Sequence, residues 1–341
     1  MNIHLNRLIF TFTIVIILLI NGCNSDSKVG SQSDKESTPK YDYICLQFLN
    51  GNDKLLFHRY RYDHNDIKEN GLFIYEISSH NLYKPLSMNG ENYPRIPIFS
   101  RDKKQVAFVS SKDGGRNIYV MNADGSNVRQ LTYSQHNAQQ AGAKLFEEES
   151  NDGPSFSPDG KRILFKRGRW MKGGTPLWSD VFEIEISTGR ERRLTNIDSH
   201  LMSNPFYLSD GKRFVFQGSK KIKDEGIYIA NNESHILNKI SAGGWWIPGP
   251  RISWNDKIVF LKGNDLFIYE NGNIKRLNWI QKRLSLRSLA ISPDGSKVYF
   301  ETEAPIDSSK LVRSQWIGKA DGTELQEISI QWEHLKKSTL D

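Results

Sequence analysis

The chain has 341 residues, of which 25% are charged and 11% are aromatic, and it carries a formal net charge of +7. This composition is typical of a globular protein that is long enough for one large domain or two small ones. The basic residues are scattered along the chain rather than clustered, so the charge favours solubility and we expect no nucleic-acid partner.

The first segment has the pattern of an export signal. Residues 8–20 carry no charge, and this run is too short for a comfortable membrane span but suits the core of a signal peptide. It ends in Ile20-Asn21-Gly22-Cys23, where a small residue precedes a thiol that a lipid can alkylate. This end resembles the lipobox of bacterial lipoproteins, which implies a signal peptide over 1–22 and lipidation of Cys23. An ordinary signal peptide, or an uncleaved anchor with a chance cysteine, is the alternative.

Residues 23–40 are polar and nearly free of large apolar side chains, so they cannot bury enough surface to fold. We expect a flexible tether there, with the lipid holding the protein on a membrane. Asn24 stands where an aspartate would resemble an inner-membrane retention signal. The predicted location is therefore the cell envelope, at the outer membrane facing the periplasm if the cell has two membranes. Cys45 is expected to be a buried thiol, without an intramolecular disulfide.

A repeated unit occupies most of the remaining chain. Its clearest copies are Pro154–Thr195 and Pro97–Thr132. Turn aspartates, or their equivalents, recur at intervals of 38 to 57 residues, which suits a four-stranded propeller blade. They lie at Asp53, Asp102, Asp159, Asp210, Asp256 and Asp294.

The residues of one copy explain why it forms a small antiparallel sheet. In Ser157-Pro158-Asp159-Gly160, proline presets φ, aspartate caps the turn and glycine accepts a positive φ. Ile163 and Phe165 then fall on one face of the next strand. Such a sheet cannot bury both faces alone, and stacking several sheets in a ring solves this while hiding their edges.

We therefore predict an all-β fold, a six-bladed β-propeller of four-stranded antiparallel blades over residues 41–330, followed by a C-terminal tail over 331–341. The ring can close in two ways. The strand near Leu325–Ile330 could simply meet blade one, or Tyr41–Leu46 could complete the last blade.

The runs FSPDGKRILF and IYVMNADGSNVRQLT resemble the PD40-type, WD40-like repeats of TolB-like propellers, and the resemblance covers nearly all of residues 43–330. It implies a six-bladed propeller with a binding role. Only the tether lies between Cys23 and Tyr41, in place of the α/β domain of TolB, which argues against a true Tol–Pal role. Propeller-containing peptidases share the repeat, but the residues after Ile330 leave no room for their hydrolase domain.

Catalytic motifs are absent from the sequence: it contains no Gly-x-Ser-x-Gly, phosphate loop, His-Glu-x-x-His or Cys-x-x-Cys. We therefore expect a binding protein rather than an enzyme, and we predict no cofactor. His136 and His200 lie in blade-to-blade connections, which would surround one mouth of the channel, and a divalent metal there is possible. Oligogalacturonate lyases use a histidine-based metal site on a related propeller, so a metal-dependent polysaccharide lyase is the alternative. The spacing fixes no third ligand.

Aromatic side chains mark the same predicted mouth. Trp245 and Trp246 stand in a Gly/Pro-rich connection, and Trp279 stands in the next one. Tryptophans are costly to expose unless a ligand or partner packs on them. Together with His136 and His200, they form the predicted binding site for an envelope protein or glycan. Alternatively, Trp245 and Trp246 plug gaps between blades.

Two further segments are candidates for partner contacts. The long connection Tyr133–Gly153 carries the acidic run Glu147–Glu149, and Ala138–Glu149 could form a short helix over the channel mouth. An aromatic and basic loop is expected within blade three. Its residues are Arg167, Arg169, Trp170, Lys172 and Trp178. Both segments could equally be ordinary solvated surface.

Overall fold

A computed structural model of the chain describes residues 40–49, 51–63, 66–87, 95–134, 147–171, 176–197, 199, 201–219, 225–233, 236–242, 248–279, 285–305, 311–330 and 335–336. Every regular element in these ranges is a β-strand. Within them, no helix is long and apolar enough to cross a membrane.

The strands form six sheets, each made mainly from one continuous stretch of chain. Blade one contains β1 (Lys40–Phe48), β2 (Lys54–Asp63), β3 (Asp66–Glu76) and β4 (Asn81–Ser87). Blade two contains β5 (Arg95–Phe99), β6 (Gln105–Ser110), β7 (Asn117–Asn122) and β8 (Arg129–Gln130). Blade three contains β9 (Glu147–Phe156), β10 (Arg162–Met171), β11 (Pro176–Glu185) and β12 (Glu191–Arg193). Blade four contains β13 (Leu201–Met202), β14 (Phe206–Tyr207), β15 (Arg213–Ser219), β16 (Gly226–Asn231) and β17 (Ile236–Ala242). Blade five contains β18 (Arg251–Ile252), β19 (Ile258–Lys262), β20 (Asp265–Glu270) and β21 (Asn273–Leu277). Blade six contains β22 (Ser285–Ile291), β23 (Lys297–Pro305), β24 (Leu311–Lys319) and β25 (Gln326–Ile328).

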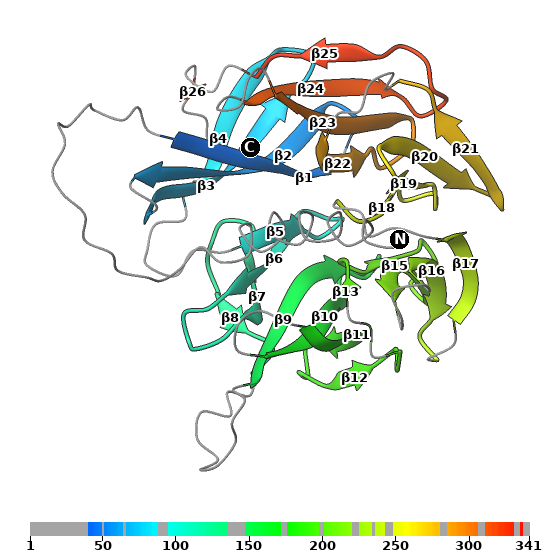
Figure 1. Ribbon diagram of the computed structural model, residues 1–341. Helices are drawn as coiled ribbons and strands as arrows, with labels where there is room; N and C mark the ends of the chain where they lie inside the picture. The colour runs from blue at the N-terminus through cyan, green and yellow to red at the C-terminus, as the bar shows by residue number, and fades with distance from the viewer. Residues whose placement is uncertain are drawn as a thin grey trace, which may run out of the picture.

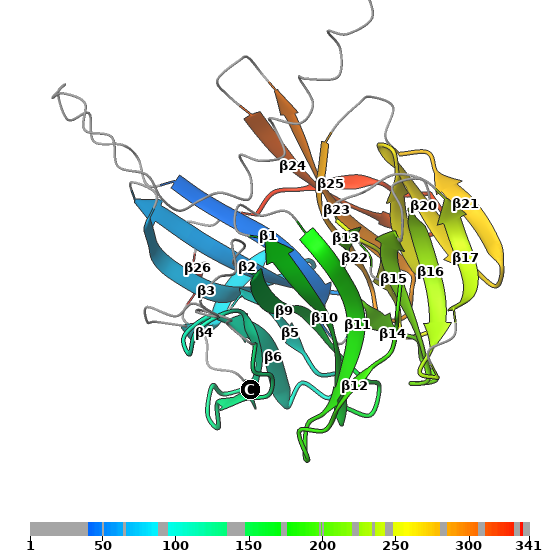
Figure 2. The ribbon, with the colours of Figure 1, turned by 60° about the horizontal axis from the view of Figure 1, so that its bottom comes forward.

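The six sheets stand around a ring in sequence order, as the colours running from blue to red in Figures 1 and 2 show. The first strand of each blade faces the channel, and β1, β5, β9, β14, β18 and β22 all contribute to one cavity there. Successive strands of a blade then pair antiparallel toward the rim. The predicted fold, an all-β six-bladed propeller, is confirmed.

The polar turn of the repeat has the chemistry that its sequence predicts. The Ser157 hydroxyl donates to Asp159 Oδ1 at 2.5 Å, and Gly160 has φ +70° while its N–H donates to Ser157 O at 2.9 Å. The backbone N–H of Arg162 in turn donates to Ser157 Oγ at 2.9 Å. The turn is therefore held by local bonds, which explains why it recurs from blade to blade.

Lys103 stands at the glycine position of this turn in blade two and has φ +60°. A non-glycine residue in this left-handed region costs about 1–2 kcal/mol. We expect Lys103→Gly to raise the free energy of unfolding by about 1 kcal/mol, measured as the shift of the urea midpoint. The matched control is Gly160→Ala. It adds a Cβ where no atom lies within 4 Å, so any change in stability comes from the backbone strain of a non-glycine residue at a φ of +70°. A Lys103→Gly protein no more stable than the wild type would contradict the expectation.

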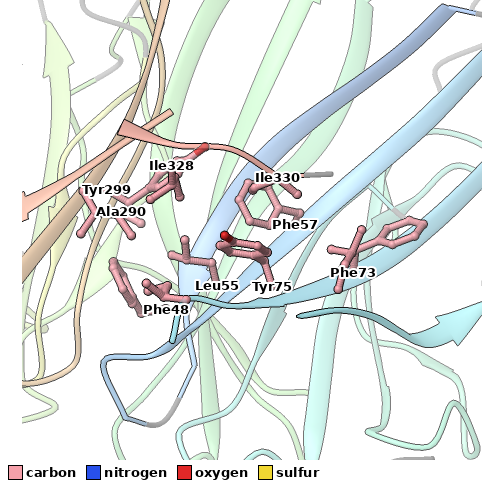
Figure 3. Packing of buried hydrophobic residues seen from close by; sticks show 12 residues of the cluster. Phe48, Leu55, Phe57, Phe73, Tyr75, Ala290, Tyr299, Ile328 and Ile330 are labelled. Atoms are coloured by element: carbon pink, nitrogen blue, oxygen red, sulfur yellow. The ribbon is translucent and has the colours of Figure 1, made fainter. Parts of the chain in front are cut away.

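Blade six closes the ring by packing directly on blade one. Figure 3 shows the shared core. Phe57 of β2 and Tyr299 of β23 meet edge to face, with ring centroids 5.7 Å apart. The remaining members are Phe48, Leu55, Phe73, Tyr75, Ile77, Leu82, Ala290, Ile317, Ile328 and Ile330.

Of the two predicted closures, the direct one is confirmed. The alternative, in which Tyr41–Leu46 completes the last blade, is wrong because β1 pairs with β2 in blade one. The predicted tail contributes an additional strand, β26 (Leu335–Lys336), which pairs parallel with β4 on the outer edge of blade one.

Polar groups join the same two blades at their turns. Asn52 donates to the Asp294 carboxylate, and Lys297 Nζ donates to Asn52 O at 3.1 Å. Burial alone would raise the pKa of Asp294, but hydrogen bonds from the Ser296 N–H, the Ser292 and Ser296 hydroxyls and Asn52 outweigh it and lower this pKa to about 2. The ionised form of Asp294 therefore stabilises the closed ring.

This carboxylate makes ring stability depend on acidity. Its contribution is complete above the unfolded pKa of 3.8 and is lost as pH falls through the folded value of about 2. Because Asp294 is exposed, we expect the loss to be only about 1 kcal/mol or less. Urea titrations at pH 5 and pH 2 measure it, and Asp294→Asn should show a smaller difference between the two. An unchanged difference would mean that other groups carry the acid sensitivity.

Candidate functional site: the channel cavity

The central channel contains a cavity of ≈ 810 Å³ that is partly open to solvent. All six blades contribute to it, through the last residues of their first strands and the turns that follow. It is lined by Leu46, Gln47, Phe48, Leu49, Ile98, Phe99, Ser100, Arg101, Lys103, Ser155, Phe156, Phe206, Tyr207, Arg251, Ile252, Trp254, Ala290, Ile291 and Pro293.

The cavity lies at the end of the channel formed by the repeat turns, which we call the turn face. Leu49, Arg101, Trp254 and Pro293 all follow the first strand of their blades. Blade-to-blade connections enter these strands at the opposite end of the channel. The cavity is therefore at the other end from the mouth that the sequence predicts as the binding site.

Two glycines lie where neighbouring blades approach each other closely. A Cβ added to Gly153 would lie 2.1 Å from Asn204 Oδ1, and one added to Gly249 would lie 2.4 Å from Ser203 Cβ. These contacts join blade three to blade four and blade five to blade four. A Cβ at either glycine would force the facing segment to shift, so both glycines allow this close approach.

Cations and aromatic rings surround the cavity. The Arg101 guanidinium lies 5.3 Å from the centroid of the Trp254 ring, and that of Arg251 lies 5.3 Å from the centroid of Phe206. Arg101 belongs to blade two and Trp254 to blade five, which face each other across a ring of six. The pair therefore spans the mouth of the cavity.

All the charged side chains among the described lining residues are positive. Arg101, Lys103 and Arg251 are cationic, and the described residues that line the cavity include no aspartate, glutamate, histidine or cysteine. Burial lowers the pKa of Arg101, and the nearby charge of Asp256 partly opposes this shift. Both Asp256 oxygens already accept hydrogen bonds from Ser209, from its N–H at 2.6 Å and its hydroxyl at 2.8 Å.

Most of the residues predicted as a binding site lie outside the described residues, namely His136, His200, Trp245 and Trp246. Trp279 lies between blades five and six, where its indole N–H donates to Gly322 O at 2.8 Å. Its ring also stacks on Phe300 at 5.8 Å. A contact between Trp279 and a partner stays a prediction. Within the described part of the chain, no three metal-ligating side chains gather into a group that could hold a metal ion.

Sequence reasoning missed Arg101 and Trp254, although a signal for them exists. Each stands at the position that proline occupies in Ser157-Pro158-Asp159-Gly160. Pro293, which keeps the proline, also lines the cavity. Departures from the repeat at this position therefore place side chains at the channel mouth.

The expected helix over Ala138–Glu149 is wrong for its last residues, because Glu147–Glu149 begin β9. Glu149 pairs with Arg169 across the β9–β10 ladder, and its carboxylate lies 3.6 Å from Arg167 Nε and 3.7 Å from Arg169 Nε. Cross-strand ion pairing thus favours the strand. The earlier part of that connection lies outside the described residues.

The expected aromatic and basic loop of blade three is partly strand. Arg167, Arg169 and Trp170 belong to β10, and Trp178 belongs to β11. Arg169 and Arg193 both lie over the Trp178 ring, at 5.7 and 5.3 Å. Of the described side chains, Arg167 and Arg169 bond to acidic partners, so they form an internal network on blade three.

Comparisons with known proteins agree with the architecture. Residues 51–169 match the family described as the dipeptidyl peptidase IV (DPP IV) N-terminal region. A Tol-Pal system protein TolB from Francisella tularensis is 34% identical over 89 residues, which are 26% of this chain and 19% of that protein. The crystal structure of TolB from Acinetobacter baumannii has a TM-score of 0.53 and 19% identity, covering 83% of this chain and 78% of that chain. An oligogalacturonate lyase in complex with manganese has a TM-score of 0.52 and 13% identity, covering 87% and 83%.

The sequence match spans about a fifth of the length of the Francisella protein, whereas the structural matches span most of the propeller. Low identity across such matches means that they establish architecture rather than activity. Six antiparallel blades, the repeat turns and these matches lead to one conclusion. The chain folds as a six-bladed β-propeller of the kind found in TolB.

Proposed function

We propose that this protein is a non-catalytic envelope lipoprotein whose propeller binds a partner protein at its channel. The observation that carries the proposal is the cavity of ≈ 810 Å³, to which all six blades contribute and whose described lining is apolar with a few cations. Preformed concave sites of this kind are where rigid scaffolds bind ligands. Sequence and fold likeness to proteins named for the Tol-Pal system supports a partner in the envelope.

Site-specific photocrosslinking in the native cell tests this role. A photoreactive residue in place of Lys103, at the cavity, should capture a partner protein. The matched control is the same residue in place of Ile274, which is 49% exposed on β21, away from the channel. Adducts at Lys103 alone support the proposal, whereas no adduct at Lys103, or equal adducts at both positions, overturns it.

The anchor is part of the same proposal. Lipidation of Cys23 would hold the protein at a membrane through the tether over residues 23–40. We expect Cys23→Ser to lose incorporation of labelled palmitate and to move the protein into the soluble envelope fraction. Retention of lipid label by this variant would contradict the anchor. His136, His200, Trp245, Trp246 and Trp279 remain proposed contacts at the opposite mouth.

A metal-dependent polysaccharide lyase is the second candidate. It is favoured by the cationic lining, since Arg101, Lys103 and Arg251 could also bind the carboxylates of a uronate polymer. Incubation of the purified protein with polygalacturonate and Mn²⁺ tests it. Release of unsaturated products, lost in Arg101→Gln, would favour the lyase over the binding protein.

A further inference from the structure

Arg101 is a cation whose side chain lies over an aromatic ring at the cavity. Among the described residues, no oxygen accepts a hydrogen bond from it, and its contacts are the face of Trp254 and the more distant charge of Asp256. A guanidinium presents five N–H donors in a planar fork that matches a carboxylate. Stacking on the indole fixes the orientation of this fork at the cavity mouth, so little side-chain freedom is lost when an anion binds.

The surroundings make an anion favourable there. Arg101, Lys103 and Arg251 line the cavity without a described carboxylate in the lining. Partial burial of Arg101, which lowers its pKa, shows that water solvates this charge less fully than it would in bulk. In such a setting, a charge-assisted and bidentate bond is stronger than on an open surface.

A second polar group is available deeper in the cavity. Ser155 of β9 is 2% exposed, and its hydroxyl has no hydrogen-bond partner among the described residues. Buried hydroxyls are normally paired, so one that lacks a partner beside a cavity points to a missing polar group. A ligand backbone or a water bound with the ligand would supply it.

The rest of the lining selects the kind of molecule. Apolar side chains dominate, and each of the six blades supplies at least one of them. A sugar polymer needs a polar partner for most of its hydroxyls, whereas a peptide can place apolar side chains against such walls. The lining therefore favours a peptide over a glycan.

We propose that the cavity on the turn face binds an acidic peptide segment of the partner protein, with a carboxylate held by Arg101 against Trp254 and neighbouring apolar side chains inserted among the walls. This inference rests on the proposed function and specifies the chemistry of the partner. It adds a recognition site on the turn face, at the other end of the channel from the mouth formed by the blade-to-blade connections.

Matched peptide libraries test the inference on the full chain in detergent. One half contains random nine-residue peptides with Asp or Glu at the centre, and the other half contains Asn or Gln there. We expect the acidic half to be enriched at least tenfold on the wild-type protein. Fluorescence polarisation of the best acidic peptide should then show at least tenfold weaker binding to Arg101→Gln than to the wild type. The affinity of the matching peptide with Asn or Gln at its centre should change less than twofold between the two proteins.

Two variants control the result. Arg190→Gln removes a cation of blade three whose side chain is 82% exposed and which does not line the cavity, so it should bind the acidic peptide like the wild type. Trp254→Leu keeps Arg101 but removes the ring beneath it, and we expect an intermediate loss. Thermal denaturation confirms that each variant is folded. Equal enrichment of the two library halves, or equal losses in Arg101→Gln and Arg190→Gln, overturns the inference.

The outcomes separate this inference from the proposed function. If photocrosslinking at Lys103 still captures a partner in the Arg101→Gln background, the binding role stands and the carboxylate contact is wrong. If nothing is captured in either background, the binding role itself is wrong. Binding of trigalacturonate that depends on Arg101, without binding of any peptide, replaces the peptide by a uronate glycan.

Discussion

Phe57→Ala is expected to lower the free energy of unfolding by about 3–5 kcal/mol, because it removes a fully buried ring from the core where blade six meets blade one. Its contact with Tyr299 is lost, and the cavity left behind lies between segments far apart in the chain. No turn of the chain connects these two strands directly. Urea denaturation followed by tryptophan fluorescence measures the loss.

Two matched substitutions make this prediction specific. Phe165→Ala removes an equally buried ring from the core shared by blades two and three, and it should cost a similar amount. Ile274→Ala, at a side chain 49% exposed, should change stability by less than about 0.5 kcal/mol. A cost for Phe57→Ala near that of Ile274→Ala would mean that the ring is not closed through this core.

Asp180→Ala should destabilise the protein by about 3–5 kcal/mol, because it removes a fully buried carboxylate and leaves its hydrogen-bond donors without their acceptor. Asp180 is 0% exposed and bonds to Arg193. Its carboxylate also accepts hydrogen bonds from the Thr195 hydroxyl at 2.5 Å and from the Ile197 N–H at 3.0 Å. These donors anchor the connection that leaves blade three, so the same urea titration should show a large fall in midpoint.

The lost charge and hydrogen bonds of Asp180, rather than its lost side-chain volume, should account for most of this destabilisation. Asp180→Asn keeps the size and one acceptor oxygen, and we expect it to cost about 1–3 kcal/mol. The exposed pair Asp265–Arg276, at 2.7 Å, is the control, and Asp265→Asn should cost less than about 1 kcal/mol. If all three variants were equally stable, the blade-three network would contribute nothing beyond surface charge.

Local chemistry explains why so much of the fold could be predicted. The turn at Ser157–Gly160 is held by bonds between neighbouring residues, so its sequence predicts its geometry. Copies of that turn then give the number of blades. Ring closure could not be predicted in the same way, since it depends on contacts between segments such as Phe57 and Tyr299, and both closures satisfied the local pattern.

The candidate site depends on the ring itself, which explains why it escaped sequence reasoning. Arg101 and Trp254 lie in blades that face each other, and only closure of six blades brings them to 5.3 Å. Each residue alone is an ordinary turn residue. The predicted mouth, by contrast, rests on His136, His200, Trp245 and Trp246, which lie outside the described residues, and its role stays a prediction.

The direction of β1 places the start of the propeller at the opposite end of the channel from the cavity. Lys40 starts this strand at the far end of the channel from Leu49, which lines the cavity. A lipid on Cys23 would therefore attach the protein by the face opposite the turn face, and the proposed flexible tether would span roughly 20–25 Å. With this proposed anchor, the membrane would lie on the side of the propeller opposite the turn face, and the open end of the cavity would point away from it. A partner would bind the cavity from the aqueous side, or from a second surface across the compartment, without competing with the lipid bilayer for space.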